Sequence, residues 1–171
     1  MPLSATAAMT IPRAILWGGL IAGVLDALDG VVAFGFNGLN PIQVLQYIAS
    51  GLLGPSSFQG GLATAGLGTL LHFFIAFVAA AVYVSASHLI PALNARPQLF
   101  GPLFGVAVFF FMNYGVLPFS AVASAPFSLG LFLNGILGHA LFVGLPIAFF
   151  ARRAGGVGVS SKVSSRPTAA A

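Results

Sequence analysis

Four long apolar stretches dominate the pattern of hydrophobic and polar positions along the chain. Each holds about 20 residues with few polar interruptions, the length that an α-helix needs to cross the hydrocarbon core of a bilayer. We therefore predict an all-α, polytopic membrane protein built as a four-helix transmembrane bundle. The predicted spans are residues 14–36, 65–87, 99–117 and 128–150.

The loop between the first two spans predicts a further, shorter helix from Pro41 to Leu53. A stripe of polar residues recurs there at helical spacing: Gln43, Gln46, Tyr47 and Ser50. Asn40 is a favourable N-cap, and Gly54 begins a turn signal that ends the helix. The segment is too short to span a bilayer. We expect an amphipathic helix lying on the outer membrane surface, or alternatively a re-entrant segment that plugs the outer end of the bundle.

The composition agrees with a membrane protein. Of 171 residues, 58% are hydrophobic and 5% are charged, and the mean hydropathy is +1.05, whereas soluble proteins carry about 25% charged residues. Two aspartates interrupt the first stretch and no clear cleavage site follows it, which favours a span over a signal peptide. The absence of cysteine excludes thiolate catalysis and iron–sulfur clusters. We expect one domain over residues 1–153 and a disordered cytoplasmic tail over 154–171.

The positive charges predict the orientation in the membrane. They lie before the first span, between the second and third, or after the fourth, and the other two loops contain none. Because positively charged loops face the cytoplasm, we expect both termini there. This distribution also accounts for the pI near 10.4, so we expect no nucleic-acid partner. The six residues are Arg13, Arg96, Arg152, Arg153, Lys162 and Arg166.

The only acidic residues of the chain, Asp26 and Asp29, lie inside the first predicted span. A charged side chain at the bilayer centre costs about 2.5–3.5 kcal/mol on insertion scales, so an acid at that depth is a candidate functional residue by default. On a helical wheel both acids share a face with Gly19 and Gly23, opposite a bulky apolar face. We expect the acids to pack against protein, either as a functional pair or as protonated structural acids.

Depth along the predicted helices groups five polar residues as a ligand- or proton-binding site. They are Asp26, Asp29, His72, Asn113 and His139. At 1.5 Å per residue, Asp29, His72 and Asn113 share a level about 20 Å from the cytoplasmic boundary, and the other two lie deeper. We therefore expect Asp29 and His72 to lie in direct or water-bridged contact. Asn134 lies about 140° around its helix from His139, so we expect only one of them to face the site.

Three hypotheses about function follow. The first is a protein that senses or moves protons, ions or a small solute at this site, with no cofactor. The second is a membrane metalloprotein or haem protein that uses Asp29, His72 and His139 as ligands, since aspartate and neutral histidine bind divalent metals. The third is a structural or accessory subunit. Hydrolase, metalloprotease and nucleotide-binding motifs are absent, so we favour a protein that is not an enzyme.

Small residues on two faces predict self-association. Gly101 and Gly105 form a small-xxx-small pair, and Gly130, Asn134 and Gly138 share a face of the fourth span. Small residues let helix backbones approach closely in lipid. We expect one of these faces to support a homodimer, which would also suit a transport pathway, because four helices are few for one.

The second half of the chain resembles a known family. It reads HFFIAFVAAAVY from His72, has Arg96 in an inner loop, then Met112-Asn113-Tyr114, Gly138-His139 and a closing Arg152-Arg153. In order and spacing, residues 65–153 resemble the YagU-like group of small bacterial inner-membrane proteins, whose namesake is associated with acid resistance. The resemblance implies a bacterial inner-membrane location. It implies no catalytic residues, and it does not extend to Asp26 and Asp29.

Overall fold

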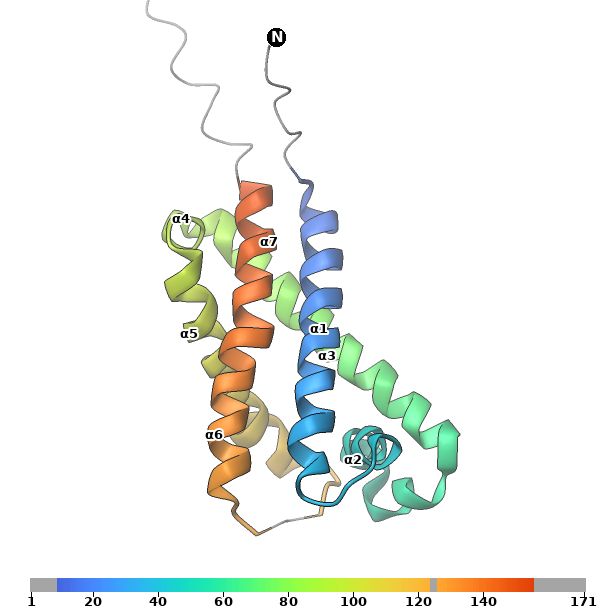
Figure 1. Cartoon of the computed structure of the whole chain (residues 1–171). Coiled ribbons are helices and arrows are strands. Elements are labelled where there is room, and N and C mark those ends of the chain that lie inside the picture. The colour runs from blue at the N-terminus through green and yellow to red at the C-terminus, as the bar shows by residue number, and fades with distance from the viewer. Residues whose placement is uncertain (1–8, 124–125, 156–171) are drawn as a thin grey trace, which may run out of the picture.

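The computed structural model describes residues 9–123 and 126–155, and every regular element in these ranges is a helix (Figure 1). Four helical segments are long and apolar enough to cross a membrane, which confirms the predicted all-α four-helix bundle. The first two are α1 (Ile11–Gly35) and α3 (Gly61–Leu89). The third joins α5 (Pro97–Phe110), η2 (Phe111–Val116) and η3 (Leu117–Phe119). The fourth joins α6 (Leu129–Gly138), η4 (His139–Gly144) and α7 (Leu145–Gly155). Shorter elements are α2 (Pro41–Leu53), η1 (Gly54–Gln59) and α4 (Pro91–Ala95).

The helices extend beyond the predicted spans at several ends. The second begins at Gly61 rather than at 65, and the fourth continues to Gly155 rather than ending at 150. Hydropathy marks only the part of a helix that is apolar, whereas the backbone hydrogen bonds continue into the polar boundary region. The predicted tail begins too early, because Ala154 and Gly155 belong to α7. Its remaining residues, 156–171, lie outside the described residues.

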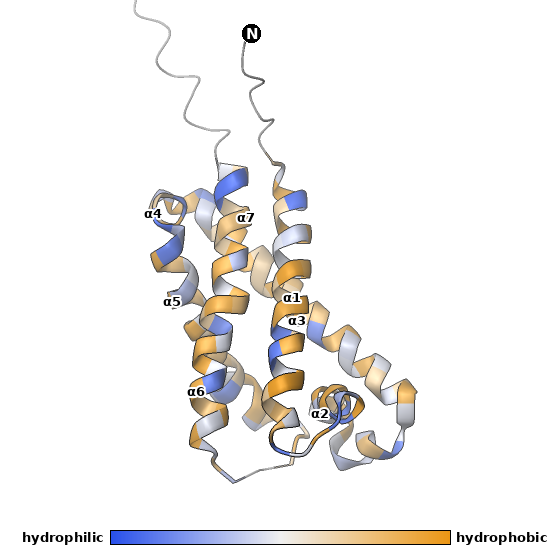
Figure 2. Ribbon diagram, viewed as in Figure 1, coloured by the Kyte–Doolittle hydropathy of each residue, from blue (hydrophilic) through white to orange (hydrophobic). Residues whose placement is uncertain are grey.

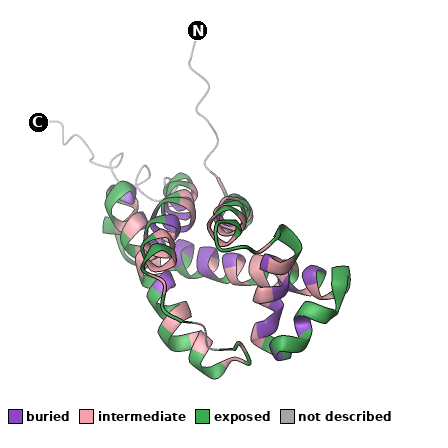
Figure 3. Cartoon of the chain, turned by 60° about the horizontal axis from the view of Figure 1, so that its bottom comes forward, coloured by how far each residue is buried: buried purple, intermediate pink, exposed green. Residues whose placement is uncertain are grey.

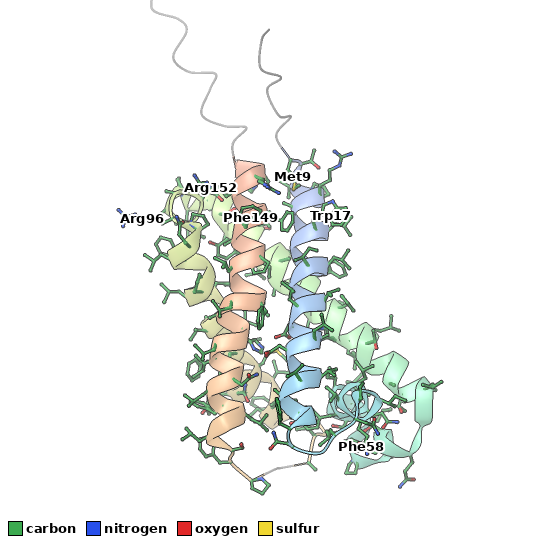
Figure 4. All side chains as sticks on the ribbon, in the orientation of Figure 1. Met9, Trp17, Phe58, Arg96, Phe149 and Arg152 are labelled. Carbon is green, nitrogen blue, oxygen red and sulfur yellow. The ribbon has the colours of Figure 1, made fainter. Side chains whose placement is uncertain are left out.

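The described ends of the chain meet at one end of the bundle. The backbone N–H of Met9 donates to the carbonyl of Arg153 at 3.2 Å, and Figure 4 shows Arg96 and Arg152 at this same end. Arg13 lies in the first turn of α1, and Arg153 in the last turn of α7. We call these four arginines the basic end. Their grouping is the arrangement that four spans and the charge pattern predict; Lys162 and Arg166 lie outside the described residues.

The core joins α1, α3 and α7 through small side chains. Ala14, Ala22, Ala80, Ala148 and Ala151 are fully buried. Leu28, Val32 and Phe74 point outward and are each more than half exposed, as expected for a surface that lipid covers. Figure 2 shows these outer faces as predominantly hydrophobic, and Figure 3 shows the buried positions along α3 and on the faces turned to it. Alanine and glycine at the contacts allow the close helix approach that is typical of membrane bundles.

The short helix α2 has the bounds that the sequence predicts, but its polar stripe faces protein. Asn40 and Gln43 form a reciprocal capping box that begins the helix. The amide of Gln46 is 3% exposed and donates to the carbonyl of Gly61 at 3.0 Å. Meanwhile Leu52 on the outer face is 63% exposed. An ordinary surface helix turns its polar side to water; here the polar side faces the first turn of α3, where the Gln46 amide donates to the Gly61 carbonyl and to the Thr64 hydroxyl.

Two glycines of α5 pack against the fourth span. A Cβ at Gly105 would collide with the carbonyl of His139, and one at Gly144 would collide with the carbonyl of Gly101. The small-xxx-small pair that predicted a homodimer is therefore used within one chain. Gly138 is also enclosed by the same chain, since its Cβ would meet the carboxyl group of Asp29. A homodimer stays a prediction, and it requires a different surface.

Candidate functional site

The two acids of α1 face the fourth span, and each has a partner there. The side-chain amide of Asn134 donates to Oδ2 of Asp29 at 2.8 Å. Nδ1 of His139 lies 3.7 Å from Oδ1 of Asp26. Asp26 and Asp29 are three residues apart and so lie about one turn apart on one helix face. The structure thus confirms that the acids face protein and brings together Asp26 and His139 of the predicted residues, with Asn134 added. We call these four residues the acid cluster.

The exclusion of Asn134 was wrong, and Gly138 explains why. At 100° per residue, Gly138 lies about 40° from Asn134, between that residue and His139 at about 140°. Gly138 has no side chain, so the Asp29 carboxyl group fills the space a Cβ would take. Asn134 and His139 then reach the acids from the two flanks of this gap. A glycine between two polar residues on the helical wheel was the signal in the sequence that both could reach one site. The prediction missed it because it treated each side chain as pointing straight outward from the helix.

His139 is held in place by backbone and by an aromatic ring. Its Nδ1 lies 2.9 Å from the carbonyl oxygen of Gly135, one turn earlier, so the tautomer with a proton on Nδ1 donates there. The ring packs edge-on against Phe109, with centroids 5.5 Å apart. His139 also begins the π-helical segment η4. Single π turns interrupt α-helices frequently at functional sites, and this one lies where the fourth span contacts both α1 and α5.

His72 does not pair with Asp29, contrary to the prediction. Its Nε2 lies 2.8 Å from the backbone carbonyl oxygen of Gly23 on α1. The predicted level was measured from the cytoplasmic boundary along upright helices, whereas α3 runs obliquely behind α1 (Figure 1) and places His72 about 16 Å from its outer end. Asp29 lies only about 9 Å from the outer end of α1 by the same measure, and Gly23 lies about 18 Å from it. His72 therefore links α1 to α3 at a deeper level than Asp29.

Asn113 contributes to its own helix rather than to the acids. Its side-chain amide donates to the carbonyl of Phe109 at 2.9 Å. Phe109 in turn contacts His139, so Asn113 touches the acid cluster only through that ring. The membrane depth estimated from the sequence placed Asn113 near Asp29, but depth alone does not tell which way a side chain points around its helix.

The acid cluster is enclosed on the protein side, and no lysine or arginine within residues 9–123 and 126–155 pairs with it. The side chains of Asp26 and His139 are 19% and 23% exposed. The nearest arginine along α1, Arg13, precedes Asp26 by about 20 Å of helix. Figure 2 shows the hydrophilic positions of α1 and α6 as isolated bands within apolar helices. Among the described residues, the basic side chain that lies beside these carboxyl groups is therefore His139.

The proposed metal ligands do not gather. Within residues 9–123 and 126–155, no three histidine, aspartate or glutamate side chains lie close enough to hold one ion. Asp29 and His72 have separate partners, Asn134 and Gly23, and His139 lies beside Asp26. The described geometry therefore offers no set of ligands built from Asp29, His72 and His139.

Comparisons with known proteins add no family. Searches against protein-family models, curated proteins and solved structures found no match. The class of protein is thus defined by the fold alone, as a multi-pass helical membrane protein with four candidate spans. The resemblance to the YagU-like group stays an expectation.

Proposed function

We propose that this membrane protein binds and releases protons at the acid cluster. The observation that carries the proposal is that two carboxyl groups, one turn apart in a membrane span, each have a partner on the fourth span while lysine and arginine lie only near the ends. Polar and ionisable residues inside membrane spans mark proton relays and ion pathways. The cluster is suited to a proton-sensing or proton-conducting role.

Charge arithmetic supports protons as the ligand. With both acids ionised and His139 neutral, the cluster carries two negative charges, and each would cost about 2.5–3.5 kcal/mol at the bilayer centre. A neutral cluster needs protons on two of its three titratable groups. Either both acids are protonated, or His139 and one acid are. These arrangements differ in whether the second proton is held by an acid or by His139, whose ring lies beside Asp26.

The orientation and the location of the protein form part of the same proposal. The basic end faces the cytoplasm of a bacterial cell, because loops rich in lysine and arginine stay on that side of the inner membrane. The described loop residues 36–60 and 120–123 at the opposite end contain no lysine or arginine. The resemblance of residues 65–153 to the YagU-like group supports the same location. Asp29, about 9 Å from the outer end of α1, is then the cluster member closer to the periplasm.

Infrared difference spectroscopy of the protein in lipid nanodiscs tests the proposal. Spectra recorded at acidic and alkaline pH should differ in the carboxyl carbonyl band, and Asp26→Asn and Asp29→Asn should each remove part of the difference. His139→Gln should shift the pH at which the band changes. His88→Gln is the matched control, because His88 is exposed in the last turn of α3 and should leave the band unchanged. A carboxyl band that ignores pH, or that survives both aspartate substitutions, would refute the proposal and leave the cluster a structural contact.

Vesicles test whether bound protons also cross the membrane. The protein would be reconstituted with a pH-sensitive dye inside, and the decay of an imposed pH gradient measured. Conduction predicts that the gradient decays faster in vesicles with the wild-type protein than in empty vesicles. Asp29→Asn should lower the decay rate to that of empty vesicles. A gradient that decays no faster than in empty vesicles, together with a titrating carboxyl band, would assign sensing rather than conduction.

A further inference from the structure

The basic end carries positive charge that the chain's own side chains cannot neutralise. The only two carboxylate side chains, Asp26 and Asp29, lie in the outer half of α1 and are engaged by the fourth span. Arg152 lies 13 residues beyond His139 and Arg13 lies 13 residues before Asp26, which is about 20 Å of helix in each case. No arginine of the basic end therefore reaches a carboxylate side chain of its own chain. Their counterions come from the surroundings.

An apolar groove of about 630 Å³ opens beside these arginines. Its walls include Ile21 of α1 and Leu145, Phe149 and Phe150 of α7, while Gln98 and Arg152 are its polar lining residues. Leu145 and Arg152 are seven residues apart, so the groove runs about 10 Å from the apolar interior toward the basic end. One end is suited to hydrocarbon and the other to an anion.

A second arginine is held at the same end. The guanidinium carbon of Arg153 lies 4.2 Å from the centre of the Phe149 ring, a cation–π contact that fixes it beside the groove wall. Figure 4 shows Phe149 and Arg152 close together on α7 and Arg96 farther away, directed outward. The guanidinium groups of Arg152 and Arg153 can both donate to phosphate oxygens, and arginine matches phosphate in paired hydrogen bonds.

We propose that this groove binds an anionic phospholipid. One acyl chain lies along Ile21, Leu145 and Phe149, and the headgroup phosphate accepts hydrogen bonds from Arg152, with Arg153 and Gln98 beside it. Basic pockets between transmembrane helices on the cytoplasmic side are typical sites for anionic headgroups. The headgroup position at Arg152 is about 20 Å from His139 along the fourth span, and the groove uses no residue of the acid cluster, so either proposal stands without the other.

Trp17 provides a built-in probe for the test. It is the only tryptophan of the chain, it is 44% exposed, and it precedes Ile21 by one helical turn. Brominated acyl chains quench tryptophan at short range. The full chain would be reconstituted in phosphatidylcholine vesicles containing a rising fraction of brominated phosphatidylglycerol or, for comparison, of brominated phosphatidylcholine with the same chains. The two titrations give the relative affinity for the anionic headgroup.

The wild-type protein should prefer the anionic lipid by about fivefold or more, since each arginine near an anionic lipid contributes roughly that factor. Arg152→Gln should lower the preference by about fivefold. Arg96→Gln is the matched control, because it removes the same charge from the same end without lining the groove, and it should keep the preference. Equal losses in the two variants would show attraction to the surface charge alone and overturn the site, as would equal quenching by both lipids. If soluble glycerol phosphate displaced the anionic lipid, the ligand of the site would be a free phosphate compound rather than a phospholipid.

Discussion

Adding a methyl group at Gly138 tests the geometry of the acid cluster most directly. The Cβ of an alanine there would meet Oδ2 of Asp29 and lie 3.2 Å from its Cγ. That oxygen is the acceptor of the Asn134 amide. Asp29 must therefore turn away, which breaks the hydrogen bond, or α1 must move back from the fourth span. We expect Gly138→Ala to destabilise the protein and to disturb its titration.

The magnitude follows from comparison with a second glycine. Gly66 lies inside α3, is exposed, and has nothing near the position of its Cβ, so Gly66→Ala should only gain helix propensity, about 1 kcal/mol. Gly138→Ala gains a similar amount but loses an interhelical hydrogen bond, worth about 0.6–2 kcal/mol in membranes, and crowds a packed contact, which costs about 1–3 kcal/mol. Gly138→Ala should therefore be less stable than Gly66→Ala by about 2–5 kcal/mol.

Unfolding by sodium dodecyl sulfate in mixed micelles measures this difference. Asp29→Ala supplies the second arm of a double-mutant cycle: in that background the methyl group meets no carboxyl group, so Gly138→Ala should cost almost nothing. Residues in contact show coupling energies of about 0.5–3 kcal/mol. If Gly138→Ala is as stable as Gly66→Ala, or if its cost is unchanged without the Asp29 carboxyl group, the contact that defines the cluster is wrong.

Three further expectations concern the rest of the bundle. Gln46→Leu should lower the unfolding free energy by about 1 kcal/mol, because it removes the hydrogen bond that the buried Gln46 amide donates to the carbonyl of Gly61; Gln59→Leu, at an exposed position of η1, should not. Gly105→Ala should also destabilise, by about 1–3 kcal/mol, through collision with the carbonyl of His139, and native mass spectrometry in mild detergent should show the same distribution of monomer and dimer as for the wild type. A reporter enzyme fused after Gly155 should be active only in the cytoplasm; periplasmic activity would overturn the orientation.

The helices were predictable because their signals are local. Apolar length marks a span whatever its neighbours do, and the bounds of α2 follow from Asn40, Pro41 and Gly54, which act within one turn of the helix ends. The position of the arginines at one end follows equally from counting spans. None of these inferences needs to know which helix lies beside which.

Predicting which side chains pair, in contrast, requires knowing which helices lie side by side. His72 was placed beside Asp29 by a depth scale that treated every helix as upright, whereas Figure 1 shows α3 running obliquely behind α1. The polar stripe of α2 was expected to face water, although the first turn of α3 provides a backbone acceptor for Gln46. In both cases the partner is a backbone carbonyl, from Gly23 or Gly61. Main-chain acceptors are present at every residue, so sequence does not single them out.

Two glycines, one in the third span and one in the fourth, connect helix packing to the proposed proton chemistry. Gly138 admits the Asp29 carboxyl group on the side of α1, and Gly105 receives the His139 carbonyl on the side of α5. His139 therefore lies where both neighbouring helices touch backbone, with Phe109 against its ring. A side chain with free space around it could gain a charge without effect on its neighbours. A histidine confined in this way cannot, so a proton gained or lost beside Asp26 acts on the contacts of three spans at once. In the proposed function, this confinement would couple proton binding at the acid cluster to the packing of the helices.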